Sequence, residues 1–231
     1  MTAASKQIQQ LNITFNTRIR ENELSAFRGA VVNKVGRKFE WFHNHDNQKG
    51  GFHHRYPRIQ YKLHRGKPMI VCLEEGIEEI YEFFGQPSWN LKIKDKDVPI
   101  VVKNLDMTSS ILEMSPTPKS YRIKNWLAFN DKNQKEYDKL PSLMEKIAFI
   151  ERVLMNHILS FTKDMGWLPP ERFKLKVTNL HEIKKIKFKN RFTKLCLTLD
   201  FDVTLNLPSF IGVGKASSTG YGMIIPNLSK A

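Results

Sequence analysis

The alternation of hydrophobic and polar residues divides the first half of the chain into a series of predicted elements. Leu11, Ile13 and Phe15 alternate with polar neighbours, which is typical of a half-buried strand, whereas apolar residues at helical spacing indicate helices. Gly85 and Pro87 end the second helical stretch. The predicted order is strand, helix, strand, strand, helix, strand, at residues 11–16, 23–32, 58–63, 68–73, 74–84 and 89–93.

A capping box and a long apolar stripe dominate the second half of the chain. Ser142 followed by Glu145 is typical of a helix N-terminus. Apolar residues then recur at helical spacing from Leu143 to Phe161, and Gly166 ends this helix. Strand-like patterns precede and follow it, at residues 122–129, 172–177 and 197–205.

Both halves predict an α+β fold made of two tandem ferredoxin-like (βαββαβ) domains. A chain of 231 residues is long enough for two small domains. We expect an N-terminal domain at residues 1–95, a boundary region containing Pro, Ser and Asp at 96–118, and a C-terminal domain at 119–231.

The charge of the chain indicates a polyanionic partner. The chain has 37 Lys and Arg against 23 Asp and Glu, and the formal net charge of +14 favours nucleic acid. No long apolar span or basic amphipathic helix indicates a membrane protein. The first ten residues lack a signal pattern, so we expect a cytoplasmic protein. Cys72 and Cys196 lie in apolar, strand-like runs and are expected to be buried thiols.

Four glycines surround a lysine near the end of the chain, in the segment Gly212-Val-Gly-Lys-Ala-Ser-Ser-Thr-Gly-Tyr-Gly222. Exposed backbone N–H groups beside a lysine suit a phosphate. The spacing fits neither a Walker loop, because Lys215 follows only G-x-G, nor a dinucleotide fingerprint, because the third glycine is misplaced. The alternative is a glycine-rich turn that closes a hairpin.

Four of the seven histidines lie close together, at positions 43, 45, 53 and 54. Histidine exchanges protons near neutral pH, so this cluster favours a general acid–base site. One alternative is a metal site with His43, His45, Asp46 and a further histidine, although no distant ligands occur at zinc spacing. Another is a solvated loop without chemistry. His157, beside the long apolar stripe, and His181, in a predicted loop, are expected to be structural.

A dense basic segment lies at residues 184–194. With Ile186 facing inward, Lys185, Lys187 and Lys189 share one face of a predicted strand. Such a row could follow the phosphates of a nucleic acid. The alternative is an ordinary solvated face.

Ordered blocks of residues along most of the chain resemble one protein family. The C-terminal G-x-G and G-x-G pair, after an alternating strand, resembles the signature loop of the RAMP superfamily of CRISPR-associated RNA-binding proteins. The N-terminal half resembles a CRISPR repeat-processing endoribonuclease of the subtype b branch. The residues that carry this second resemblance are His43-Asn-His-Asp46, Arg55-Tyr-Pro57, Gln60-Tyr-Lys62 and Gly66-Lys-Pro68.

The resemblance implies a metal-independent endoribonuclease, without cofactor, that cuts CRISPR precursor RNA within its repeats. In such a reaction the ribose 2′-OH attacks the adjacent phosphate, which needs a base, an acid and positive charge on the phosphorane. The family's active-site histidines carry over onto His43 and His45, and its tyrosine onto Tyr56, for which core packing is the alternative. The family's lysine carries over onto either Lys34 or Lys38.

The expected partner is CRISPR repeat RNA, and the resemblance also implies other CRISPR effector subunits. The protein is expected to be a monomer or a homodimer without membrane contact. One alternative function is a non-catalytic RNA-binding subunit of an effector complex, and a more distant one is a metal-dependent nuclease or deaminase. The predicted RNA-binding residues are Arg55, Lys185, Lys187, Lys189, Gly212, Gly214, Lys215, Ser217, Ser218, Gly220, Tyr221 and Gly222.

Overall fold

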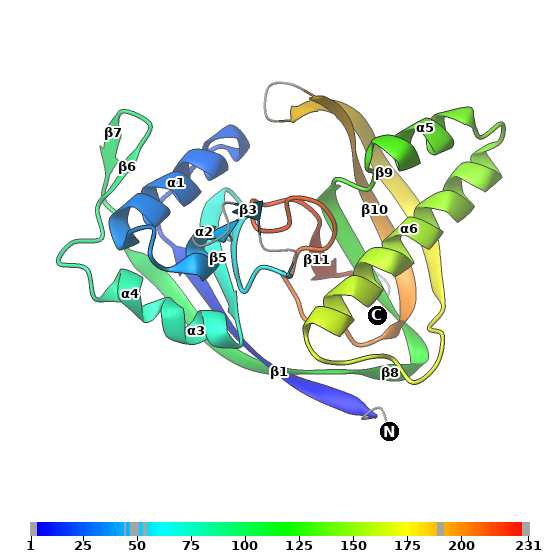
Figure 1. Ribbon diagram of the computed structural model, residues 1–231, viewed down its shortest axis with the longest axis horizontal. Coiled ribbons are helices and arrows are strands. Elements are labelled where there is room, and N and C mark those ends of the chain that lie inside the picture. The colour runs from blue at the N-terminus through cyan, green and yellow to red at the C-terminus, as the bar shows by residue number, and fades with distance from the viewer. Residues whose placement is uncertain (1–3, 44, 47–50, 53–54, 189–191, 228–231) are drawn as a thin grey trace. The chain divides into compact units, whose positions relative to one another are not determined.

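A computed structural model describes residues 4–43, 45–46, 51–52, 55–188 and 192–227, with the backbone alone at 45–46, 51–52, 188 and 192 (Figure 1). The chain forms two compact units. The N-terminal unit comprises Ile8–Ser110 and Ser218–Gly220, and the C-terminal unit comprises Met1–Gln7, Ile111–Ser217 and Tyr221–Ala231.

The N-terminal unit contains a sheet with the strand order β4-β5-β1-β8. Strand β5 runs antiparallel to both β1 and β4. Numbered by position along the chain, the order of the four strands is 2-3-1-4, as in a ferredoxin-like fold. The strands are β1 (Ser5–Phe15), β4 (Ile59–His64), β5 (Lys67–Leu73) and the first part of β8 (Val102–Trp126).

Helices pack against one face of this sheet and bury an aromatic core (Figure 1). Phe15 of β1 contacts Phe27 and Phe83 edge to face, and Phe27 contacts Tyr61 of β4 in the same way. Edge-to-face pairs add to the stabilisation that burial alone provides. The helices are η1 (Glu21–Glu23), α1 (Leu24–Val35), α2 (Glu40–His43), α3 (Glu75–Glu79) and α4 (Tyr81–Phe84).

The last strand of the N-terminal unit differs from the prediction. Residues 89–93 were expected to complete the sheet, but β6 (Leu91–Ile93) pairs with β7 (Lys96–Val98) in a separate hairpin. The fourth strand of the sheet is β8. The predicted helix at 74–84 is also divided, into α3 and α4. A further short pairing joins β2 (His45–Asp46) to β3 (Gly51–Phe52).

The C-terminal unit repeats the same strand order. Its sheet has the order β9-β10-β8, β11 pairs with the other side of β8, and all these pairings are antiparallel. The glycine-rich segment occupies the place between β10 and β11 where a ferredoxin-like fold has its second helix. The additional strands are β9 (Leu175–Phe188), β10 (Phe192–Leu205) and β11 (Met223–Pro226).

Two helices precede β9 in this unit. Helix α6 (Leu143–Asp164) runs alongside β9 and begins with the predicted capping box, in which the Ser142 hydroxyl accepts from the Glu145 N–H (Figure 1). Helix α5 (Asp131–Lys139) was not predicted from the sequence. Of its nine residues only Tyr137 is buried, so the segment lacks an apolar stripe.

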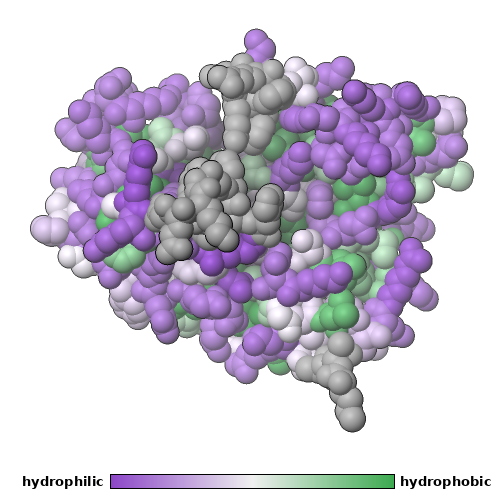
Figure 2. All heavy atoms as spheres, in the orientation of Figure 1, coloured by the Kyte–Doolittle hydropathy of each residue, from purple (hydrophilic) through white to green (hydrophobic). Residues whose placement is uncertain are grey.

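The two units divide between Ser110 and Ile111, a point within the predicted boundary region 96–118. Strand β8 passes through this point without interruption. None of the helices that the structure describes is long and apolar enough to cross a membrane. Most of the surface visible in Figure 2 is hydrophilic.

His181 lies on β9 and not in a loop, so that part of the prediction was wrong. Its Nε2 lies 2.8 Å from Asp200 Oδ2, and Arg122 donates two further hydrogen bonds to the Asp200 carboxylate. The Arg122 guanidinium, followed by the imidazole, lowers the pKa of Asp200. His181 therefore belongs to a polar network that joins β8, β9 and β10. Cys72 and Cys196 are buried free thiols, as predicted.

Candidate active site and RNA-binding surfaces

One side of α1 forms a polar pocket in the N-terminal unit. The pocket has a volume of about 440 Å³ and contains two arginines and one of the predicted catalytic histidines. The residues on α1 recur at helical spacing, which places them on one face. The lining residues are Ser25, Arg28, Gly29, Val32, Asn33, Arg37 and His43.

A hydrogen bond of the imidazole ring holds His43, the last residue of α2, in the pocket. Its Nε2 lies 2.8 Å from the carbonyl oxygen of Arg37. Because a carbonyl can only accept, Nε2 carries the proton of this hydrogen bond. In the neutral imidazole the lone pair therefore lies on Nδ1, which is the nitrogen able to accept a proton. His43 is buried, with 7% of its surface exposed.

The backbone around His43 is fixed by two further hydrogen bonds. Arg28 Nη2 donates to the His43 carbonyl over 2.7 Å, and the Tyr61 hydroxyl donates to the Phe42 carbonyl over 3.2 Å. The Arg28 guanidinium also lies 5.9 Å from the centre of the Tyr61 ring. Three contacts thus fix the position of the imidazole, which is the preorganisation that proton transfer requires.

Arg28 has an unsatisfied donor at this pocket. Its Nε is buried and has no hydrogen-bond partner among the described residues. Burial lowers the pKa of Arg28, but a guanidinium remains charged in proteins. A guanidinium that lines a polar pocket attracts an anionic oxygen, with which it forms charge-assisted hydrogen bonds. The pocket therefore suits a phosphate group.

Among the predicted catalytic residues whose side chains the structure describes, Tyr56, Lys34 and Lys38 do not line this pocket. The backbone of His45 begins β2, and its side chain lies outside the described residues. Tyr56 is buried, with 8% of its surface exposed. Lys34 lies in the last turn of α1, and the Lys38 amine lies 4.7 Å from the centre of the Phe39 ring.

The described side chains form no cluster of three His, Cys, Asp or Glu that could hold a metal ion. The side chains of residues 45, 46, 53 and 54, on which the sequence-based metal hypothesis depends, lie outside this description. The arrangement that the structure does provide at His43 is one of proton donors and cations, which suits acid–base chemistry on a phosphodiester.

Arg55 packs against an aromatic ring close to the predicted histidine block. Its guanidinium lies 3.5 Å from the centre of the Trp41 ring and forms an ion pair of 3.1 Å with Glu40. Side-chain exposures of 38% for Arg55 and 34% for Glu40 leave both groups accessible. An arginine stacked in this way presents its remaining donors in a fixed orientation, which suits a phosphate or a base edge.

Gly214 is required where the glycine-rich segment meets α6. Trp126 Nε1 donates to His157 Nδ1 over 3.1 Å, and a Cβ on Gly214 would come within 2.7 Å of the first nitrogen and 2.9 Å of the second. The φ angle of Gly214 is +85°, which only glycine adopts without strain. Burial, with a smaller contribution from Lys215, lowers the pKa of His157 to about 4. The neutral imidazole therefore accepts the Trp126 hydrogen bond at physiological pH.

Two other glycines of the segment allow close packing within their own units. A Cβ on Gly222 would lie 2.0 Å from the Val213 carbonyl oxygen, and a Cβ on Gly220 would lie 2.3 Å from Leu24 Cδ2. The Gly222 N–H donates to the Asn125 carbonyl. The close packing explains these glycines without a ligand.

The remaining predicted residues of the segment differ in exposure. Gly212 and Ser217 are buried, and the Ser218 carbonyl accepts a hydrogen bond of 2.9 Å from the Tyr61 N–H. Tyr221 is partly buried, whereas Lys215 is exposed. Partial burial of the Lys215 amine lowers its pKa, and the charge of the nearby Lys194 lowers it further. Lys215 is therefore the charged group that this segment presents to solvent.

The predicted basic face on β9 is partly described. Lys185 pairs with Leu195 and Lys187 with Thr193 of β10, and both lysines are exposed. Lys189 lies outside the described residues. The alternation of a strand places Lys185 and Lys187 on the same face of the sheet.

Lys62 is a buried lysine in the N-terminal unit. It is fully buried on β4, and desolvation lowers its pKa to about 7. Gln60, two residues earlier on the same face, is also fully buried, and its amide donates to the Pro57 carbonyl. The Gln60-Tyr-Lys62 block is therefore inside the protein and not on its surface.

Sequence analysis missed the two arginines of the pocket. Arg28 lies among the apolar residues that predicted α1, so the helix was read only as a core element. The signal was nevertheless present, because Ser25, Arg28 and Asn33 recur at helical spacing and give α1 a second, polar face. Arg37 contributes through its carbonyl, which residue type does not reveal.

Comparison with known proteins gives a consistent result for both halves of the chain. The family model of the Cas6b N-terminal domain matches residues 6–111, and that of the Cas6b C-terminal domain matches residues 113–227. The uncharacterized protein MJ0978 of Methanocaldococcus jannaschii is 31% identical over 104 residues, which are 45% of this chain and 68% of that protein.

Solved structures share the fold. A crystal structure of Cas6b aligns with a TM-score of 0.85 at 24% identity and covers 96% of this chain and 100% of that one. A crystal structure of the CRISPR RNA processing endoribonuclease Cas6b aligns over the same shares with a TM-score of 0.72 at 21% identity. Csf5, a CRISPR-Cas type IV Cas6 crRNA endonuclease, aligns with a TM-score of 0.62 at 12% identity and covers 96% of this chain and 100% of that one.

Proposed function

Because the chain belongs to the Cas6b family, we propose that it is an endoribonuclease that cleaves CRISPR precursor RNA within its repeats. The observation that carries this proposal is the fixed position of His43 in a pocket with Arg28 and Arg37. The reaction that fits this arrangement is transesterification, in which no metal or cofactor takes part.

In this reaction the 2′-oxygen of the ribose forms a bond to the adjacent phosphorus, and the bond from phosphorus to the 5′-oxygen breaks. A base removes the proton of the 2′-OH, and an acid supplies a proton to the leaving 5′-oxygen. The products are a 2′,3′-cyclic phosphate and a 5′-OH end. The atoms balance without water, and DNA is not a substrate because it lacks the nucleophile.

His43 is one member of the proton-transfer pair and His45 is the other. The hydrogen bond from His43 Nε2 to the Arg37 carbonyl directs proton exchange to Nδ1. A base held in orientation by a carbonyl keeps one tautomer throughout the reaction. Tyr56, which is largely buried, orients the ribose.

Positive charge on the phosphorane comes from the pocket's arginines. The hydrogen bond from Arg28 to the His43 carbonyl holds its guanidinium in place, so little reorganisation is needed when the transition state forms. Lys34, in the last turn of α1, or Lys38, after the end of that helix, is the lysine that the family pattern favours for this role.

The RNA is held along surfaces of both units. Arg55, stacked on Trp41, binds near the cleavage site, and Lys215 with the backbone of the glycine-rich segment binds phosphates elsewhere. The exposed Lys185 and Lys187 extend this contact, so binding is strongly dependent on salt. The protein acts as a monomer or homodimer in the cytoplasm, and it stays bound to its product and joins other CRISPR effector subunits.

The test is cleavage of the cognate repeat RNA in EDTA, beside the same RNA with 2′-deoxyribose at every candidate cut site. We expect a single cut, only in the ribose RNA, with a cyclic phosphate end. His43→Gln keeps an N–H for the Arg37 carbonyl and removes the basic nitrogen, so cleavage should fall by about 10²- to 10⁴-fold with RNA binding retained. His64→Gln, on β4 of the same unit, is the matched control and should cleave normally.

Binding without any cut would indicate a non-catalytic RNA-binding subunit instead. Cleavage that returns only with a divalent metal would overturn the acid–base mechanism and make the histidines metal ligands. Full activity of His43→Gln would remove His43 from the site.

A further inference from the structure

A carboxylate of the C-terminal unit pairs with one lysine, and a second lysine lies on a neighbouring segment. Asp131, the first residue of α5, forms an ion pair with Lys194 of β10. Lys215 belongs to the glycine-rich segment, and it forms a bridge to Leu127, four residues before Asp131. The backbone pairing of Lys215 with Leu127 brings the glycine-rich segment beside the start of α5, where Lys194 pairs with Asp131.

The burial of the pair is strongly unequal. The Lys194 side chain is 11% exposed, whereas Asp131 is 80% exposed. The lysine is thus held in place by the protein around it, and the carboxylate lies on the side of the solvent. An exposed carboxylate can leave without disturbing the fold, because water solvates it readily.

The charges at this point are electrostatically linked. Lys194 and then Lys215 lower the pKa of Asp131, and Lys194 lowers the pKa of Lys215. An anion between two lysines reduces the electrostatic repulsion between their positive charges. A single carboxylate neutralises the charge of only one of them. A phosphate diester could take the same position with respect to both amines.

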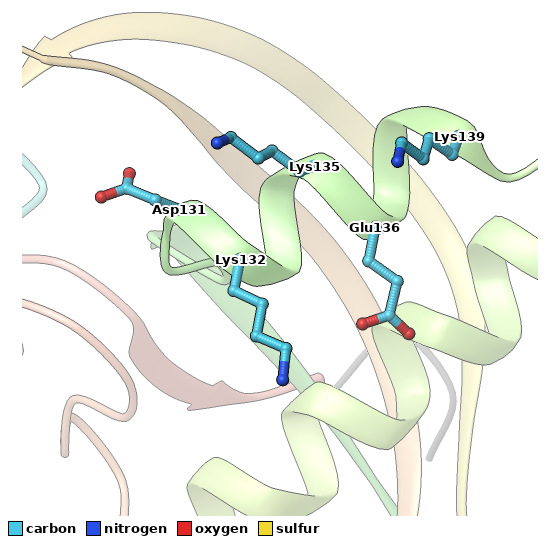
Figure 3. A pocket seen from close by; sticks show the side chains of 5 residues that line it. All are labelled: Asp131, Lys132, Lys135, Glu136 and Lys139. Atoms are coloured by element: carbon cyan, nitrogen blue, oxygen red, sulfur yellow. The ribbon is translucent and has the colours of Figure 1, made fainter.

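Helix α5 carries three lysines and three carboxylates. Lys132, Lys135 and Lys139 line a pocket of about 480 Å³ together with Asp131 and Glu136 (Figure 3). Figure 3 shows Asp131 projecting beyond the first turn of the helix, to a different side from Lys132. Glu136 is engaged by Arg152 over 2.8 Å. Of the three α5 carboxylates, Asp131 is the one that pairs with Lys194 of β10.

We propose that Lys194 and Lys215 form a binding site for a phosphate of the RNA backbone, and that Asp131 is an internal competitor which occupies this site until RNA displaces it. The proposal rests on the proposed function, since it takes RNA as the ligand. In the free protein Asp131 keeps the Lys194 amine in position. On binding, a phosphate replaces the carboxylate. Because the phosphate must compete with Asp131, the protein binds RNA less tightly than it would without Asp131.

The test compares two substitutions that change the net charge equally. Asp131→Asn removes the competitor, and Asp138→Asn, on the same helix, removes a carboxylate that accepts from Gln134. Binding of repeat RNA with 2′-deoxyribose at the cut sites is measured by fluorescence anisotropy over a salt series. A surface ion pair corresponds to at most about a fivefold change in an equilibrium constant, so Asp131→Asn should lower the Kd by up to about fivefold at low salt. Asp138→Asn should have a smaller effect.

Substitution of the lysines completes the test. Lys194→Gln and Lys215→Gln should each weaken binding and reduce the slope of log K against log salt by about 0.7–0.9. In the Lys194→Gln background, Asp131→Asn should no longer tighten binding, because the two residues act as a pair. Circular dichroism of each variant checks that the fold is kept, and Lys215→Gln alone is sufficient if Lys194→Gln does not fold.

The outcomes separate this inference from the proposed function. Wild-type protein that does not bind repeat RNA would overturn both. Normal binding with equal effects of Asp131→Asn and Asp138→Asn would overturn only the competitor role of Asp131. The same would follow if Asp131→Asn tightened binding equally in the absence of Lys194 or Lys215.

Discussion

Replacement of Gly214 by alanine should destabilise the C-terminal unit more than the same change at Gly166. Both glycines have left-handed φ angles, +85° and +77°. An added Cβ at Gly166 meets no atom within 4 Å, whereas at Gly214 it would lie 2.7 Å from Trp126 Nε1 and 2.9 Å from His157 Nδ1. The pair of variants therefore separates backbone strain from steric clash.

The expected losses follow from these contacts. A left-handed alanine costs about 1–2 kcal/mol, and this is the whole effect expected for Gly166→Ala. Gly214→Ala adds about 1–3 kcal/mol for overpacking and about 1 kcal/mol for the displaced hydrogen bond between Trp126 and His157. The sum for Gly214→Ala is about 3–6 kcal/mol.

Urea unfolding followed by far-UV circular dichroism measures both losses in the same buffer. The m-values should be unchanged if only the stability of the folded state differs. An equal loss in the two variants would mean that the Trp126–His157 contact does not constrain the glycine-rich segment, and the reasoning would be refuted.

Two further predictions concern stability. Because desolvation lowers the pKa of Lys62 to about 7, the unfolded state binds one more proton between pH 7 and about 10.5, and the free energy of unfolding should rise with pH across this window by up to about 1.4 kcal/mol per unit. Lys62→Met should reduce this slope relative to wild type in urea titrations at several pH values, and parallel curves would contradict the assignment. Ser142→Ala removes the hydroxyl that accepts from the Glu145 N–H at the start of α6, and it should lower the free energy of unfolding by about 1 kcal/mol in the same assay, with no change counting against the cap.

The elements predicted well from the sequence are those with a strong period. Strand β4 alternates, β5 is a short apolar run after a turn, and α1 and α6 carry apolar stripes, so pattern alone located them within a few residues. Strand β8 was missed in its first part because Leu105, Met107 and Ile111 are each at least half exposed, which leaves no buried face to produce alternation. Helix α5 was missed for the same reason, since it buries only Tyr137.

The candidate site was predicted in part. His43 was identified from the block in which it lies, and the structure provides the pocket around it. Neither Lys34 nor Lys38 lines that pocket, where the cations are Arg28 and Arg37. Which of several basic residues faces a site depends on the exact start of α1 and on the loop after it. Sequence patterns do not determine element boundaries so finely.

The way the chain alternates between its two units limits how the protein can be taken apart. Cleavage between Ser110 and Ile111 would cut β8 in the middle and separate each unit from residues that belong to it. The first fragment would lack Ser218, whose carbonyl accepts the Tyr61 N–H beside the candidate active site. Each unit is thus built from segments that are separate in the sequence. Neither half of the chain can be inherited, exchanged or expressed as an independent module without losing residues that belong to its unit.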